Sequence, residues 1–287
     1  ANEWAQHECK LDRYSTDRAV HETPIQIAVP AVLSVSLLKP HELDEWDAFV
    51  AGHPAGTIYH TSAWMRVTQQ GLGHQPYYIC VRGESGTIVA TLPLFLVKGI
   101  FGRRLISVPM RDRGGLLSVH PRATSRLLEY LSELSQQLKC HYVELRSFHE
   151  PDIKVMHENG FVTRRHWVTT CVDLSPGVET LWKALDRDFV RWSIKKAARQ
   201  GVTFEFDNTI EGIEIFYRLF VRTRSSMGIP PFPRALFSEI HAHLIRAGKA
   251  CLALVKKDGT PINAMISLFS GESFIPAYAA PQNVWRK

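Results

Sequence analysis

The chain has 287 residues, of which 45% are hydrophobic and 22% are charged, which is typical of an ordinary soluble globular protein with one long or two average domains. Lysine and arginine exceed aspartate and glutamate by 34 − 28 = 6, so anionic partners are favoured. This excess does not choose between nucleic acid, a nucleotide and anionic lipid.

Several classes of protein are excluded by simple patterns. The five cysteines form no CxxC pair, and their odd number argues against a disulfide framework, so a reducing compartment fits better. No stretch reaches the roughly 20 apolar residues of a membrane helix, and the N-terminus lacks the order of a signal peptide. We therefore expect a cytoplasmic protein.

The first half of the chain alternates strand and helix patterns after a loose lead-in at 1–30. The crossover from the strand at 104–108 through a helix to the strand at 141–146 implies a parallel or splayed pair within a mixed sheet. The predicted elements are a strand at 33–38, helices at 42–50 and 63–71, strands at 77–82, 87–97 and 104–108, a helix at 121–138, a strand at 141–146, a short helix at 152–159 and a strand at 168–174.

A basic helix is predicted at 175–201. Ser175 suits the N-cap, Pro176 the first helical position and Gly201 the position after the last turn. Four cations spaced four residues apart fall on one face of this helix: Arg187, Arg191, Lys195 and Arg199. This stripe is either a solvated face, partly neutralised by neighbouring aspartates, or the wall of a cleft that holds phosphates or carboxylates.

The element order then repeats. We predict a strand at 203–206, helices at 213–227 and 234–247, and strands at 250–256, 261–269 and 273–280. The segment at 81–95 also resembles the segment at 255–269, which argues for a duplicated module.

These patterns predict an α/β fold with mixed sheets, built from two modules at 31–174 and 202–287 that the basic helix at 175–201 links. The second module shows no counterpart of the loop, crossover helix and fifth strand of the first. A sheet that ended there would leave an apolar edge open, so we expect this module to be truncated.

Common catalytic motifs are absent. There is no phosphate-binding GxxxxGK[ST], no convincing GxGxxG, no HExxH and no GxSxG. The 13 histidines show no metal-ligand spacing, so we predict no metal site. Activity would therefore depend on positioning and on polar groups in loops.

The loop at 111–115 is the strongest candidate for such groups. Arg111 and Arg113 can hold phosphate, Gly114 and Gly115 let backbone N–H groups approach a ligand, and Asp112 can bind an ammonium or orient an amine. The alternative is a structural turn with an Asp–Arg pair. Further candidates for the same cleft are His60, Trp64, Arg146 and Tyr278, where Trp64 and Tyr278 also suit an aromatic core.

Five segments in this order resemble the FemAB-like branch of the GNAT acyltransferase superfamily, from about residue 33 to 287. They are Tyr59-His60-Thr61-Ser62-Ala63-Trp64, the Leu92-Pro93-Leu94-Phe95 hairpin, Phe101-Gly102-Arg103-Arg104-Leu105 with Asp112-x-Gly114-Gly115, the segment from Val190 to Ala197 with Gly201, and Tyr278-Ala279-Ala280.

The resemblance implies two GNAT-like modules around a cleft, and transfer of an acyl or aminoacyl group to an amine. Fem proteins take the group from aminoacyl-tRNA and build peptidoglycan cross-bridges, so a cell-envelope precursor, peptidoglycan or polysaccharide, is the implied acceptor. By position, Asp112, Arg191 and Tyr278 match the acceptor side and become the candidate catalytic residues. The substrate-binding candidates are His60, Trp64, Arg111, Arg113, Gly114, Gly115, Arg146, Arg187, Lys195 and Arg199.

The donor stays open between aminoacyl-tRNA and acyl-CoA, with no bound cofactor expected. The chain has neither the long helical hairpin of tRNA-docking Fem proteins nor the R/Q-x-x-G-x-G/A loop of acetyl-CoA users. The basic stripe suits a polyanion, which favours tRNA. A rival prediction is a non-catalytic module that binds anionic lipid or nucleic acid through the basic helix.

Overall fold

The structure, a computed structural model, describes residues 32–100, 102–111, 113–147, 150–164 and 169–282. In this part of the chain, no helix combines the length and the apolar character that crossing a membrane requires.

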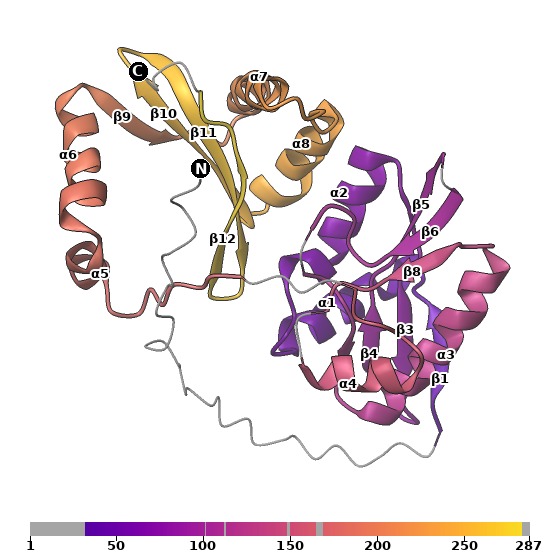
Figure 1. Cartoon of the computed structure of the whole chain (residues 1–287). Helices are drawn as coiled ribbons and strands as arrows, with labels where there is room; N and C mark the ends of the chain where they lie inside the picture. Colours follow the sequence, from indigo (N-terminus) through magenta and orange to yellow (C-terminus); the bar gives the residue numbers. More distant parts are fainter. Residues whose placement is uncertain (1–31, 101, 112, 148–149, 165–168, 283–287) are drawn as a thin grey trace, which may run out of the picture.

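Two modules follow one another along the chain (Figure 1). The first contains β1 (Ser34–Leu37), α1 (Leu43–Gly52), α2 (Ser62–Leu72), β2 (Gln75–Pro76), β3 (Ile79–Arg82), β4 (Ile88–Leu92), β5 (Phe95–Gly99), β6 (Gly102–Ile106), β7 (Leu117–Ser118), α3 (Pro121–Gln137), β8 (Tyr142–Glu144) and α4 (Glu150–Glu158), with 3₁₀ turns at Pro40–Glu42 and Ile58–His60. After a linking segment, the second contains β9 (Val202–Phe206), α7 (Ile210–Ser226), α8 (Arg234–Ile240), β10 (Ala250–Lys257), β11 (Thr260–Ser270) and β12 (Ser273–Ala279), with a π-helical turn at His241–Ile245.

The first module has two four-stranded sheets, ordered β1-β3-β4-β7 and β2-β5-β6-β8. The single strand predicted at 87–97 is wrong, because the chain leaves β4 at Pro93 and enters the other sheet as β5. A proline has no N–H to give to a ladder, so a strand ends there readily. Helix α1 packs on one face of the first sheet and α3 on the other, which gives three layers.

The predicted parallel pair is confirmed. Strands β6 and β8 run parallel, with Arg104 opposite Tyr142 and Ile106 opposite Glu144. Beyond these residues the backbone N–H of Ser107 still donates to Glu144, at 3.0 Å, but the Arg146 N–H donates to the Ser107 hydroxyl instead of a ladder carbonyl, at 3.0 Å. The two strands therefore separate at their carboxyl ends, and loops can enter between them.

The second module is an antiparallel sheet ordered β12-β11-β10-β9. Asp258 and Gly259 both have positive φ in the tight β10–β11 turn, a conformation that suits the twist of a hairpin. Leu252, Leu254 and Ile266 face α7 and α8 and are fully buried. The order of one strand, two helices and a meander matches the first module, so the α/β fold with tandem modules is confirmed.

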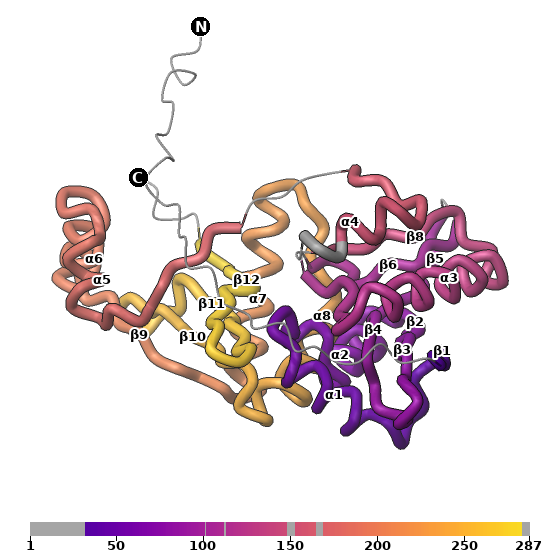
Figure 2. Tube along the Cα trace, turned by 90° about the horizontal axis from the view of Figure 1, so that it is seen from below, coloured from indigo at the N-terminus to yellow at the C-terminus, as the bar shows by residue number. Residues whose placement is uncertain are grey.

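Helix α2 joins the two modules. Its Trp64 and Val67 lie in the same hydrophobic cluster as Phe237 and Ile240 of the second module. A Cβ atom on Gly71 would lie 2.7 Å from the Leu236 Cα, so α2 and α8 meet almost backbone to backbone. Figures 1 and 2 both show these helices side by side. One hydrophobic cluster therefore spans both modules, beside two clusters that belong to the first module.

The linking segment differs from its prediction. One continuous helix is wrong: the structure has α5 (Val178–Ala184), a π-helical turn at Arg187–Arg191 and α6 (Trp192–Arg199). Leu185 is extended and ends α5, and the Asp186 carboxylate accepts the Phe189 N–H at 2.6 Å to start the next turn. The cap of α5 is Gly177, whereas the Ser175 hydroxyl donates to Asp173.

The strand predicted at 168–174 is also wrong for the residues that can be compared. Val168 lies outside the described residues, and 169–174 form no strand and are exposed. Their apolar pattern suits a strand, but no neighbouring strand edge pairs with them in the described sheets.

Candidate functional site

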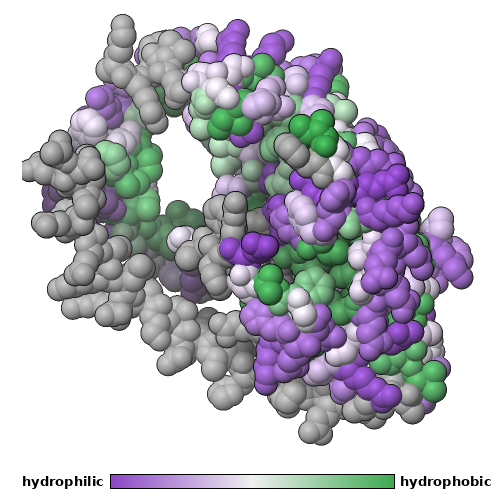
Figure 3. Space-filling view, turned by 45° about the vertical axis from the view of Figure 1, so that its right-hand side comes forward, coloured by the Kyte–Doolittle hydropathy of each residue, from purple (hydrophilic) through white to green (hydrophobic). Residues whose placement is uncertain are grey.

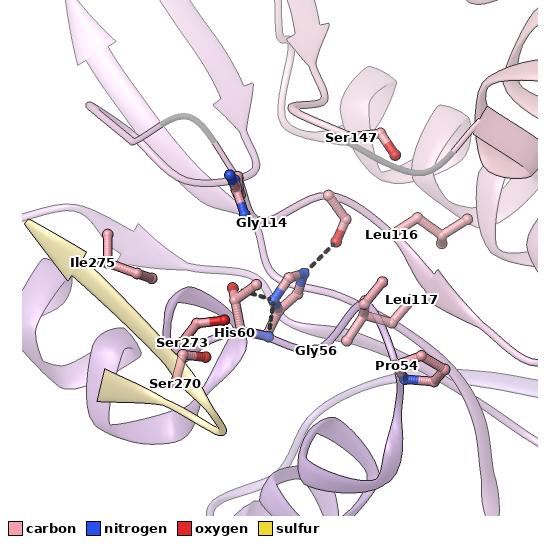
Figure 4. A pocket seen from close by; sticks show the side chains of 14 residues that line it. Pro54, Gly56, His60, Gly114, Leu116, Leu117, Ser147, Ser270, Ser273 and Ile275 are labelled. Carbon is pink, nitrogen blue, oxygen red and sulfur yellow. Dashed lines mark hydrogen bonds between the residues drawn. The ribbon is translucent and has the colours of Figure 1, made fainter. Parts of the chain in front are cut away.

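A pocket of about 200 Å³ lies between the two modules (Figure 4). The loops after β6 and β8 form one side, at the carboxyl ends of the parallel pair, and the β11–β12 turn forms the other. Its lining residues are Pro54, Ala55, Gly56, Thr57, His60, Arg113, Gly114, Gly115, Leu116, Leu117, Ser147, Ser270, Ser273 and Ile275.

The two glycines of the predicted loop allow close packing of the protein backbone. A Cβ atom on Gly115 would lie 2.8 Å from the Ser147 Cα, and one on Gly114 would overlap the Val108 side chain. The Gly114 N–H donates to the Arg146 carbonyl, at 3.3 Å. The loop after β6 is therefore seated directly on the chain that follows β8.

His60 holds the loop at 111–115 through a hydrogen bond to Gly115. The Thr57 N–H donates to its Nδ1, at 3.1 Å, so Nε2 carries the proton and donates to the Gly115 carbonyl, at 3.2 Å. Burial lowers the pKa of His60 to about 4, although the bond to Gly115 opposes the shift. The ring is therefore neutral and both of its nitrogens have protein partners.

Arg111 connects the first module to β12. Its guanidinium carbon lies 4.1 Å from the centre of the Tyr278 ring and 6.0 Å from that of Trp64, and its Nη1 donates to the Ala277 carbonyl, at 3.4 Å. Burial raises the pKa of Tyr278 to about 12, while the nearby Arg111 charge opposes the shift. Tyr278 therefore stays protonated at neutral pH.

Arg146 holds the start of the same loop. It donates to Glu144, at 2.7 Å, to the Val108 carbonyl, at 3.2 Å, and to the Arg111 carbonyl. This side chain is occupied by protein acceptors, and it positions the loop. Asp112, the other predicted residue of the loop, lies outside the described residues.

The comparisons with known proteins agree with this architecture. Residues 186–282 match a family model described as an acetyltransferase (GNAT) domain. The crystal structure of FemX is similar in fold, with a TM-score of 0.64 and 16% sequence identity over 88% of this chain and 81% of that chain.

The chain has a tandem GNAT-like fold that is similar to that of FemX. The structure of L-PGS from Bacillus licheniformis is similar too, with a TM-score of 0.54 and 16% identity over 86% of this chain and 67% of that chain. Among curated proteins, the sequence finds no match.

The FemX-like fold gathers some predicted site residues and leaves others apart. His60, Arg113, Gly114 and Gly115 line the pocket, and Trp64, Arg111 and Tyr278 form the adjoining contact between the modules. The basic stripe does not enter the pocket lining. Arg187, Lys195 and Arg199 are exposed, and Arg191 is partly buried, with a Nε atom that has no hydrogen-bond partner in the described part of the chain.

Three residues of the GNAT-like second module were missed by the sequence reasoning. Ser270, Ser273 and Ile275 form the far side of the pocket, and Ser270 accepts the Ile58 N–H across the module boundary, at 2.8 Å. Serines in a hairpin turn give no signal that separates a site from an ordinary turn. Among the described lining residues there is one cation, Arg113, and no carboxylate. The described residues also contain no cluster of three or more side chains of the kinds that hold a metal.

Proposed function

We propose that this protein is an N-acyltransferase that moves an acyl or aminoacyl group to an amine in the pocket between its modules. The observation that carries the proposal is the position of the pocket at the carboxyl ends of β6 and β8, closed from the other side by the second GNAT-like module. In sheets of this kind, ligands bind where loops leave the carboxyl ends of strands. The family match and the FemX-like fold support transfer chemistry.

The reaction needs few chemical groups. The amine nitrogen attacks the acyl carbonyl carbon, the carbonyl oxygen becomes an oxyanion, and collapse releases the carrier as a thiol or a hydroxyl while the amine loses a proton. The hydroxyls of Ser270 and Ser273 and the Arg113 guanidinium are donors of the type that stabilises an oxyanion. Ser270 accepts a backbone N–H through its oxygen, and a hydroxyl that accepts one hydrogen bond can still donate another.

The candidate catalytic residues keep different roles in this proposal. Tyr278 stays protonated at neutral pH and lies in the contact beside the pocket, and its catalytic role stays a prediction that rests on the resemblance. Asp112 is the proposed partner of the acceptor amine, and Arg191 stays a prediction that rests on the resemblance alone. The acceptor we propose is an amine of a cell-envelope precursor, which the Fem resemblance implies.

The donor is proposed as a CoA thioester or an aminoacyl-tRNA. The description of the matching family as an acetyltransferase favours the thioester. The exposed cations Arg187, Lys195 and Arg199 favour a polyanion, which is the reason to retain tRNA as the second candidate. Both donors place an activated carbonyl next to the amine, so the chemistry of the pocket is the same.

Mass spectrometry tests the proposal directly. The protein is incubated with acyl-CoA or with charged tRNA and a panel of amine-bearing peptidoglycan and polysaccharide precursors, and acylated products are measured. Ser273→Trp fills the pocket, so we expect kcat/KM to fall at least about tenfold. Ser132→Trp, on the exposed side of α3, is the control and should leave the rate unchanged. Product formation that Ser273→Trp leaves intact, or no product from either donor, contradicts the proposal.

A further inference from the structure

Ser107 is a buried polar residue just after the end of β6. In Figure 3 hydrophilic residues predominate on the surface of the first module, and the chain at the end of β6 lies inside, where Leu105, Ser107 and Val108 are fully buried. A buried hydroxyl costs free energy unless it is hydrogen-bonded. The partner of the Ser107 hydroxyl is the backbone N–H of Arg146, at 3.0 Å.

This hydrogen bond replaces one bond of the parallel β6–β8 ladder. The last regular bond runs from the Ser107 N–H to the Glu144 carbonyl, at 3.0 Å. At the same spacing, the next bond would run from the Arg146 N–H to the Ser107 carbonyl. The Ser107 side chain accepts this N–H in place of its own carbonyl, so regular pairing stops at this residue.

Pro109 removes the ladder bond that would follow. That bond would run from the N–H of residue 109 to the Arg146 carbonyl, and proline has no N–H. The Arg146 carbonyl accepts the Gly114 N–H instead, at 3.3 Å. The loop at 111–115 therefore takes the place that β6 would have in a continued ladder, and its glycines come to line the pocket.

The turn that leads into this loop holds a strained residue. The Arg111 N–H donates to the Val108 carbonyl, at 3.1 Å, with Pro109 and Met110 between them. Met110 has a φ of 63°, the sign that the third residue of a type II turn has and that glycine adopts most easily. The Arg146 side chain donates to the carbonyls at both ends of this turn. Such strain persists only where the surrounding contacts hold the backbone in place.

We propose that Ser107 and Pro109 are positioning residues of the pocket. Together they divert two successive bonds of the β6–β8 ladder and place the loop at 111–115 in the pocket lining. The role of this placement in group transfer rests on the function proposed above, whereas the placement itself does not.

An ordinary strand end explains these contacts less well. At a fraying end, the N–H and carbonyl groups that leave the ladder turn to water. Here both backbone groups of Arg146 have protein partners, the Ser107 hydroxyl and the Gly114 N–H, and both partners belong to the chain that follows β6. The backbone bonds are therefore redirected within the protein, as buried backbone groups require.

Amide hydrogen exchange, followed by NMR on the full chain, tests the placement of the loop. Ser107→Ala removes the acceptor of the Arg146 N–H, and Pro109→Ala supplies an N–H that competes for the Arg146 carbonyl. In both variants the Gly114 amide should exchange at least about tenfold faster relative to the amides of β10. Because the two variants act on different bonds, Pro109→Ala decides the question if Ser107→Ala does not fold.

Two further variants are the controls for this experiment. Ser107→Thr keeps the hydroxyl and should keep the slow exchange at Gly114. Ser267→Ala removes a similarly buried hydroxyl from β11, 1% exposed, and should leave the relative rate at Gly114 unchanged. An unchanged relative rate in the folded alanine variants of Ser107 and Pro109 overturns the proposal, and so does an equal increase in Ser267→Ala.

Transfer measurements test the link to function. With the donor that the unmodified protein uses, Ser107→Ala and Pro109→Ala should lower kcat/KM at least about tenfold at a temperature where all variants are folded. Ser107→Thr should recover most of this loss. Faster exchange at Gly114 with an unchanged kcat/KM overturns the role in the pocket. No transfer by the unmodified protein contradicts the proposed function alone, and the exchange at Gly114 still decides the placement of the loop.

Discussion

At the scale of single residues, His60 makes stability depend on pH. Its folded-state pKa is about 4, below the ordinary value of 6.5, because the buried ring is held neutral. Below about pH 6.5 the unfolded chain binds a proton at His60 that the folded protein does not bind. The free energy of unfolding therefore keeps its full value above about pH 6.5 and falls as the pH is lowered from there to about 4. A shift of this size corresponds to about 3 kcal/mol of unfolding free energy. We expect urea unfolding to show this loss between pH 6.5 and 4.

The control for this prediction is His60→Gln, whose amide can still donate to Gly115 but does not titrate. The variant should lose most of the acid-dependent decrease. His74, whose pKa burial also lowers, contributes in the same direction in both proteins, so the difference between them isolates His60. Parallel pH profiles of the two proteins would show that His60 is not held neutral.

Arg111 is expected to stabilise the contact between the modules. Arg111→Met removes the cation over the Tyr278 ring and the hydrogen bond to Ala277, so we predict a loss of about 1–2 kcal/mol in urea unfolding. Arg111→Lys, which keeps the charge but not the planar group, should recover part of the loss. Arg103→Met is the control, since this exposed side chain makes one long hydrogen bond to Leu138, at 3.3 Å, and should change stability by less than about 0.5 kcal/mol. Equal losses for Arg111→Met and Arg103→Met would contradict the prediction.

These residues also show what the sequence could and could not predict. The loop at 111–115 was selected because arginines and glycines follow a strand, and the structure places three of its residues in the pocket lining. The pattern did not show that Arg111 and Arg146 are occupied by protein partners. Charge in a sequence indicates what a side chain can bind, but its neighbours decide what it does bind.

At the scale of helices and strands, the α2–α8 contact depends on a residue without a side chain. A Cβ atom on Gly71 would lie 2.7 Å from the Leu236 backbone, which cannot give way as a flexible side chain can. We therefore expect Gly71→Ala to destabilise the protein by about 1–3 kcal/mol in spite of its better helix propensity. Thermal and urea unfolding measure the change.

Gly52→Ala is the matched control, because nothing lies within 4 Å of its added Cβ at the end of α1. This variant should be neutral or more stable by up to about 1 kcal/mol. If Gly71→Ala were stabilising to the same extent, α2 and α8 could not be in the close contact that the structure shows.

The bounds of helices and strands are predicted best where residues such as proline or glycine mark the ends of an element. Helix α3 begins at Pro121 and follows a clear leucine period, so its bounds were predicted almost to the residue. The linking segment at 178–199 has the same kind of apolar period, but an extended residue at Leu185 interrupts it. No glycine or proline marks that break. In the sequence Asp186 is indistinguishable from the other charged residues of the basic face, although it caps the next helical turn.

At the scale of the whole molecule, the sequence predicted two modules but not how they join. Apolar periodicity in α2 indicates that Trp64 and Val67 are buried, but not which module buries them. The structure places them in the core of the second module, with Phe237 and Ile240. A linear chain with a linking segment suggests two independent units, whereas a shared core links their stabilities.

We therefore predict that the two modules unfold as one cooperative unit. Leu127→Ala removes a fully buried side chain from the first module alone, and Leu236→Ala removes one from the shared core. Each should cost about 2–5 kcal/mol of unfolding free energy. In one cooperative unit, Leu127→Ala speeds hydrogen exchange in β10 of the second module as much as in β3 of the first, because both exchange through the same global opening. Mass spectrometry of exchanged peptides measures both strands in one experiment. If Leu127→Ala speeds exchange in β3 and leaves β10 protected, while Leu236→Ala affects both, the modules open separately and α2 alone transmits between them.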